Sequence, residues 1–121
     1  MPPKFKFKIA TLNVKGLNDQ GKQQRTLTLL KSYNLDLIMI QETNLNNENT
    51  QNFLKQQWIY NSYWSNKVAI LAGNKNIIFK NVKIEYNGRV ILASFSFKGL
   101  LFYITNTYTL SMILPIAFLQ L

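Results

Sequence analysis

The sequence lacks histidine and cysteine altogether and has only five acidic residues against 14 basic ones. Without imidazole or thiolate side chains it has no histidine general base, no thiol nucleophile, no disulfide and no ordinary zinc site. Any catalysis must therefore depend on oxygen and amide groups. The absence of cysteine fits a reducing compartment, and the alternating charges after Met1 leave no apolar signal-peptide core. We therefore expect an intracellular protein, nuclear or cytoplasmic.

What the sequence does contain is positive charge and enough apolar residues for a core. It has 121 residues, 47% of them hydrophobic, and a formal net charge of +9, which suits one globular unit. Lysine and arginine neutralise phosphates, so this charge favours a polyanionic partner such as DNA. Twelve of the 14 basic residues are lysine and asparagine occurs 15 times, which also fits the nucleotide bias of an AT-rich genome. Both explanations stay open.

The end of the chain is apolar, with no charged residue after Lys98. Residues 99–121 are long enough to cross a bilayer, which takes about 20 residues. A polar block at 105–109, followed by Ser111 and Pro115, interrupts this stretch. A spanning helix needs apolar residues there, so we expect no membrane span.

The first third of the chain predicts a strand and then a helix. Lysines at 4, 6 and 8 alternate with apolar residues, which predicts a strand ending near residues 13–14 with Phe5, Phe7, Ile9 and Thr11 on its buried face. Residues 20–33 are good helix formers with leucines at helical spacing.

A second strand is predicted at residues 35–40, a short and mainly apolar run of the kind that is buried on both faces. A strand–helix–strand unit makes its two strands parallel in nearly all cases, and ligands bind beyond the carboxyl ends of parallel strands. Asn13 and the Gln41–Glu42 pair follow these two ends. We therefore expect them to meet at one edge of a sheet.

The remainder predicts mostly antiparallel strands, because β-branched and aromatic runs alternate with turn residues. An asparagine-rich loop at 43–52 leads into a short helix at 50–57. Asn87-Gly88 predicts a hairpin, since a type I′ turn needs positive φ at both central residues. Residues 112–121 favour a helix that covers apolar strand faces. The predicted strands are 58–60, 67–71, 77–86, 90–97 and 100–108.

Three predicted strand ends carry polar residues suited to phosphate chemistry. The Glu42 carboxylate can hold a hard divalent cation such as Mg²⁺ without histidine or cysteine. Asn13 and Tyr108 can hydrogen-bond phosphate oxygens. Each also has a simpler explanation: Asn13 as a turn cap, Glu42 as a solvated loop carboxylate, and Tyr108 as an aromatic at the core edge.

Five segments together resemble the N-terminal half of the endonuclease/exonuclease/phosphatase superfamily, which has the DNase I-like fold. The most similar members are the apurinic-like endonuclease domains of LINE-type retrotransposons. The resemblance implies an α/β (α+β) chain forming the N-terminal part of a four-layer α/β/β/α sandwich, with a βαβ unit followed by an antiparallel meander. It also implies a hydrolase acting on DNA. The segments are 9–18, 36–43, 67–71, 88–91 and 105–108.

The resemblance also implies roles for three residues. The asparagine matching Asn13 orients the metal site and the phosphate, the glutamate matching Glu42 binds Mg²⁺, and the tyrosine matching Tyr108 contacts the scissile phosphate. One departure is Ser111, which stands where the family commonly has a supporting asparagine.

A second departure concerns the family's later catalytic motifs, Asp-x-Asn and Asp-His. The only aspartates here, Asp19 and Asp36, precede Glu42, and there is no histidine. We therefore expect residues 1–121 to be a partial domain, truncated at the C-terminus, with weak or absent Mg²⁺ binding and no nuclease activity of its own.

Two other functions stay open. One is a non-catalytic basic nucleic-acid-binding protein that uses the lysine-rich first strand and stacks bases on exposed aromatics such as Tyr60, Tyr63 and Trp64. The other is a superfamily member acting on lipid or sugar phosphates. Further substrate-binding residues and the oligomeric state do not follow from the sequence.

Overall fold

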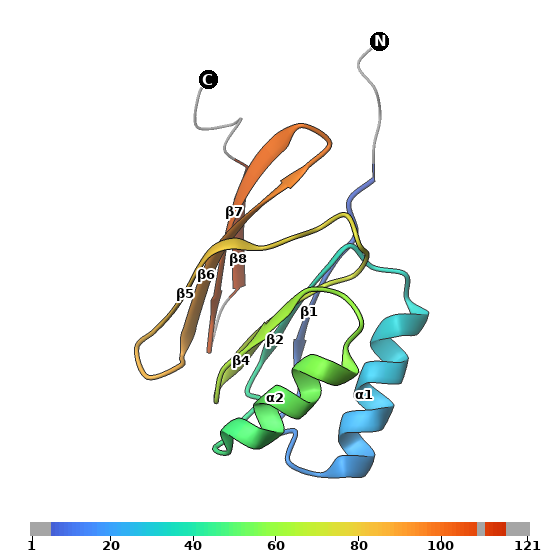
Figure 1. The fold of residues 1–121 in the computed structure, drawn as a ribbon, viewed down its shortest axis with the longest axis vertical. Coiled ribbons are helices and arrows are strands. Elements are labelled where there is room, and N and C mark those ends of the chain that lie inside the picture. Colours follow the sequence, from blue (N-terminus) through green and yellow to red (C-terminus); the bar gives the residue numbers. More distant parts are fainter. Residues whose placement is uncertain (1–5, 109–110, 116–121) are drawn as a thin grey trace.

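The computed structural model describes residues 6–108 and 111–115. Two four-stranded sheets pack face to face, and both helices lie on the outer face of the first sheet (Figure 1). This confirms the mixed α/β class and the βαβ start. The elements are β1 (Ile9–Asn13), α1 (Gln20–Ser32), β2 (Leu37–Gln41), α2 (Glu48–Gln57), β3 (Ser62–Trp64), β4 (Val68–Ala72), β5 (Lys80–Glu85), β6 (Val90–Phe97), β7 (Leu100–Thr107) and β8 (Ser111–Pro115).

The first sheet has the strand order β1-β2-β4-β3. Its first pair, β1 and β2, is parallel as predicted, whereas β4 runs antiparallel to both of its neighbours. Every residue of β2 and β4 is buried. These two central strands are continuous apolar runs because helices cover one of their faces and the second sheet covers the other.

The core has two parts, one on each face of the first sheet. Successive side chains of a strand point to opposite faces, so β2 sends Ile38 and Ile40 toward the helices and Leu37 and Met39 toward the second sheet. Among the described residues this gives three layers, α/β/β. On the outer face of the second sheet, Tyr103 is 45% exposed.

The predicted buried face of the first strand is wrong over most of its length. Ile9 and Thr11 are exposed, and Ala10 and Leu12 are the half-buried residues. The reason is that β1 is an edge strand, and Leu12 packs into the core beneath the helices while Ile9 lies where the second sheet leaves the strand uncovered. Phe7, just before the strand, does pack against aromatic rings of the second sheet.

Near α2 the sequence misplaced two boundaries. The helix begins at Glu48, inside the predicted loop, because the Asn47 side chain caps it by accepting a hydrogen bond from Asn49 N. The predicted strand at 58–60 is absent, since Trp58 N donates to Leu54 O and ends the helix. The strand follows later, as β3.

The second sheet has the sequential order β5-β6-β7-β8. Its first hairpin confirms the Asn87-Gly88 prediction, since both residues have positive φ and Arg89 N donates to Tyr86 O. The predicted strand at 77–86 begins only at Lys80.

The helix predicted at 112–121 is wrong where the structure can be compared with it. Residues 111–115 form β8, which pairs antiparallel with β7, because the edge of β7 offers unpaired backbone donors and acceptors. Residues 116–121 lie outside the described part. Neither described helix is long and apolar enough to cross a membrane.

Candidate phosphate site at the strand ends

The two predicted strand ends do meet. In the parallel pair, Asn13 lies opposite Gln41, and Val14 N donates to Gln41 O at 3.0 Å. The antiparallel neighbour β4 places Val68 on the other side of Gln41. The residues that follow β1 and β2 and precede β4 therefore gather at one edge of the first sheet, as the βαβ argument predicts.

Asn13 shapes the turn that leaves this edge. Its side chain is exposed, and its Oδ1 accepts a hydrogen bond from Lys15 N at 3.0 Å, which is the turn-forming role that asparagine often has. Lys15 and Gly16 then take positive φ, and Gly16 N donates to Glu42 O at 2.6 Å. Because Oδ1 serves the turn, the Nδ2 amide of Asn13 is the group that can donate to a ligand.

Glu42 stands directly after β2 in an uncommon backbone conformation. Its φ is 58°, a left-handed value that costs a non-glycine residue free energy. The bond from Gly16 N to its carbonyl and that from Thr43 N to Lys67 O, at 3.0 Å, hold the chain on both sides. The carboxylate is half-buried at the loop surface.

The second sheet is tied to this edge by a buried amide, Asn106 on β7. Its Nδ2 donates to Ile40 O at 3.1 Å and to Ala69 O at 2.8 Å, and its Oδ1 accepts from Gln41 Nε2 at 2.9 Å. The side chain is fully buried and satisfied. These bonds bring the end of β7 against the ends of β2 and β4.

Tyr108 reaches the same region because it follows Asn106 by two residues. Its backbone N donates to Arg89 O at 2.8 Å, and the side chain is half-buried. The Lys67 Nζ lies 5.7 Å from the centroid of the Tyr108 ring and donates to Asn44 Oδ1 at 3.3 Å. The lysine ammonium therefore stands between Tyr108 and the loop that follows Glu42.

Sequence reasoning missed Lys67 and Asn106 as site residues, although both lie in segments that carry the resemblance. Asn106 could have been found as an amide on the apolar, inward-facing side of β7, in line with Phe102 and Ile104. Nothing in the sequence marks Lys67 among 12 lysines, because its neighbours come from distant segments.

The strand ends bring one predicted metal ligand, the Glu42 carboxylate, to this edge of the first sheet. Mg²⁺ takes oxygen ligands, and protein sites supply one or two carboxylates together with substrate phosphates. Glu42 supplies one such carboxylate, and the Oδ1 of Asn13 accepts a hydrogen bond from Lys15 N. Within residues 6–108 and 111–115 no three histidine, cysteine, aspartate or glutamate side chains come together as a metal site.

The predicted base-stacking aromatics do not form an exposed platform. Trp64 is 6% exposed, and its Nε1 donates to Ser62 Oγ at 3.1 Å. The face of Tyr63 is covered by the Lys55 ammonium, 3.9 Å from the ring centroid, and burial lowers the pKa of Lys55. Tyr60 is half-buried beside Trp58. The prediction of exposed stacking residues is therefore wrong for Trp64 and unsupported for the two tyrosines.

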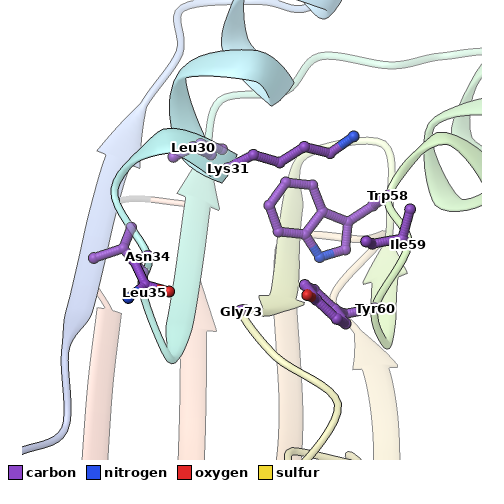
Figure 2. Close-up of a pocket in the computed structure, with 8 residues that line it drawn as sticks. All are labelled: Leu30, Lys31, Asn34, Leu35, Trp58, Ile59, Tyr60 and Gly73. Carbon is purple, nitrogen blue, oxygen red and sulfur yellow. The ribbon is translucent and has the colours of Figure 1, made fainter.

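The opposite end of the first sheet carries a hollow of about 180 Å³. Figure 2 shows the Trp58 indole in this hollow, with Lys31 and Tyr60 near it. The indole Nε1 donates to Ala72 O at 2.7 Å, and Lys31 Nζ lies 6.0 Å from the indole ring. The hollow is lined by Leu30, Lys31, Asn34, Leu35, Trp58, Ile59, Tyr60 and Gly73. It offers no carboxylate or hydroxyl cluster for catalysis.

No protein-family model and no curated protein matches this sequence. Solved structures do match. An AP endonuclease from Archaeoglobus fulgidus is 22% identical, with a TM-score of 0.61 over 75% of this chain and 38% of that chain. TDP2 from D. rerio, complexed with a single-strand DNA product, is 20% identical, with a TM-score of 0.62 over 82% of this chain and 44% of that chain.

These matches establish a DNase I-like α/β fold, in agreement with the fold that the resemblance implies. This chain spans less than half the length of either matched structure.

Proposed function

We propose that this chain is part of a phosphodiesterase domain of the DNA endonuclease type, which binds DNA at the strand-end site and does not cleave it alone. The observation that carries the proposal is the convergence of three strand ends. The Asn13–Gln41 register joins the first two, and the Asn106 hydrogen bonds join the third. The proposal is also supported by the similarity in fold to an AP endonuclease and to TDP2, which was solved with a single-strand DNA product.

In this proposal Asn13, Tyr108 and Glu42 surround the same phosphate group of the DNA. Asn13 donates through Nδ2, and Tyr108 donates through its hydroxyl, since both can reach an anion from the loop surface. Glu42 matches the glutamate to which the family resemblance assigns metal binding. The finer assignment, an endonuclease of the LINE retrotransposon type, rests on the sequence motifs.

The proposed lack of cleavage follows from what the sequence omits. A general acid or base contributes about 10²- to 10⁴-fold to a rate. The Asp-x-Asn and Asp-His groups of the family have no counterpart among these 121 residues, which contain no histidine. The site can then hold a phosphate, while the family's water-activating aspartate has no counterpart in this sequence.

A nicking assay tests this function. Purified protein is incubated with Mg²⁺ and either supercoiled DNA or an oligonucleotide containing an abasic site, and binding is followed in parallel. We expect binding without strand cleavage. Nicking that disappears in Glu42→Ala, purified in the same way, would contradict the proposed inactivity. Absence of any DNA binding at low salt would contradict the proposed function itself.

A further inference from the structure

The strand-end site combines one carboxylate, Glu42, with one lysine ammonium, Lys67. Glu42 is the carboxylate that follows β2, whereas Lys67 holds its ammonium beside Tyr108. We infer that this site binds a nucleic-acid phosphate through the Lys67 ammonium, without a divalent cation. The inference rests on the proposed function and specifies how that site holds its ligand.

The backbone around Lys67 is fixed independently of its side chain. Lys67 N donates to Ser65 Oγ at 3.2 Å, and Lys67 O accepts from Thr43 N at 3.0 Å. The next residue, Val68, begins β4 opposite Gln41. A change of the side chain therefore leaves these bonds in place, and the residue can be altered without removing the element that carries it.

The side chain of Lys67 is directed into the site. Its Nζ donates to Asn44 Oδ1 at 3.3 Å and lies 5.7 Å from the Tyr108 ring centroid. An ammonium has three N–H donors, and the Asn44 amide, a neutral group, takes one of them. This contact therefore does not compensate the positive charge of Lys67. The ammonium can donate charge-assisted hydrogen bonds to phosphate oxygens, and such bonds are stronger than hydrogen bonds between neutral groups.

A lysine ammonium and a divalent cation can each hold a phosphate. Both would bind the same phosphate oxygens, and their like charges repel each other. Removing the Glu42 carboxylate changes DNA affinity in opposite directions in the two cases. If Mg²⁺ bridges protein and phosphate, removing the carboxylate weakens binding; if Lys67 holds the phosphate, removing the carboxylate relieves repulsion and strengthens binding.

The test measures the affinity of the whole chain for a fluorescent single-stranded oligonucleotide, in EDTA and in millimolar Mg²⁺, over a range of salt concentrations. We expect wild-type affinity in EDTA to equal or exceed that in Mg²⁺. Lys67→Gln should weaken binding roughly fivefold to tenfold and reduce the salt slope by about 1. Glu42→Gln should tighten binding in EDTA about twofold to fivefold.

Lys75→Gln is the matched control, because it removes the same charge from an exposed lysine in the loop after β4, at the opposite end of the first sheet. Lys67→Arg should keep most of the affinity, since it keeps the charge. Thermal melts of each variant exclude loss of folding as the cause.

Two results would overturn the inference while leaving the proposed function intact. One is Mg²⁺-dependent binding that Glu42→Gln abolishes. The other is an equal loss of affinity in Lys67→Gln and Lys75→Gln, which would mean that only overall charge matters. Failure of the wild-type chain to bind DNA under any condition would overturn both.

Discussion

The two ends of the first sheet use polar groups in different ways. At the end that holds Trp58, polar groups are paired within the protein: the indole Nε1 binds Ala72 O, and the Asp36 carboxylate accepts from Lys8 N and from Asn74 Nδ2, each at 2.8 Å. At the strand-end site, Lys67 contacts a neutral amide. Two protein donors therefore hold the Asp36 carboxylate at one end, whereas the Lys67 ammonium at the other end has a neutral acceptor and lies beside the Tyr108 ring.

This difference indicates that the Trp58 end contributes mainly to stability and the strand-end site mainly to binding. Internally paired groups and buried aromatic area at the Trp58 end hold the helices to the sheet. The loops at the other end carry donors that face solvent, which is where rigid scaffolds usually place binding residues. Substitution of a packed residue at the Trp58 end should therefore change stability, and substitution of an exposed residue at the strand-end site should change binding.

The largest effect is expected at the packed end, from Trp58→Ala. Truncating a buried tryptophan should lower the free energy of unfolding by about 3–5 kcal/mol, measured by urea denaturation. DNA affinity of the protein that remains folded should not change. Ile59→Ala is the control, because Ile59 is 71% exposed and its loss should alter stability little. Reduced affinity in folded Trp58→Ala would mean that the two ends are coupled.

A smaller effect is expected from Asn106→Ala, which should impair both stability and binding. Losing its side chain leaves the Ile40 and Ala69 carbonyls and the Gln41 amide without this partner, and an unsatisfied buried group costs about 1–3 kcal/mol. We expect a total loss of about 3 kcal/mol, with weaker DNA binding because Tyr108 is no longer anchored.

Urea denaturation and oligonucleotide titration of the same Asn106→Ala preparation measure both effects. Asn76→Ala, at an exposed loop asparagine, provides the comparison. Wild-type stability in Asn106→Ala would show that the buried amide does not join the two sheets.

The smallest effect on stability is expected at Asn13. Asn13→Ala removes the bond to Lys15 N and should cost about 1 kcal/mol or less, since the site is exposed. Asn13→Asp keeps an acceptor for the turn but removes the Nδ2 donor and adds a negative charge. It should therefore retain near wild-type stability in urea while binding DNA more weakly than Asn13→Ala. The reverse order of affinities would exclude a phosphate contact at this residue.

Several helices, strands and turns of the fold can be predicted from the local sequence pattern. The helix at 20–33 and the apolar strand after it appear within two residues of their predicted bounds, and the Asn87-Gly88 hairpin forms as its φ requirement demands. The predictions are wrong where tertiary packing, and not the local sequence pattern, determines the conformation or burial of a segment. The alternation from residue 4 onward could not tell that an edge strand would keep Ile9 at the surface. The tail at 112–115 took its conformation from the edge of β7.

Within the candidate site, the sequence placed Asn13 beside Gln41 because a βαβ unit makes its strands parallel and aligns their ends. It could not identify the bonds of Asn106 to Ile40 and Ala69, or the approach of Lys67 to Tyr108. These contacts depend on how two sheets pack, and packing joins residues that no local periodicity relates.

The sequence by itself determined which chemistry this protein can use. A chain without histidine or cysteine, with five acids, is limited to oxygen, amide, amine and guanidinium groups wherever it folds. Only the tertiary structure decided which of its 12 lysines stands beside Tyr108. Composition is a property of the chain, whereas the surroundings of one charge are set by segments distant in sequence that come together only when both sheets have formed.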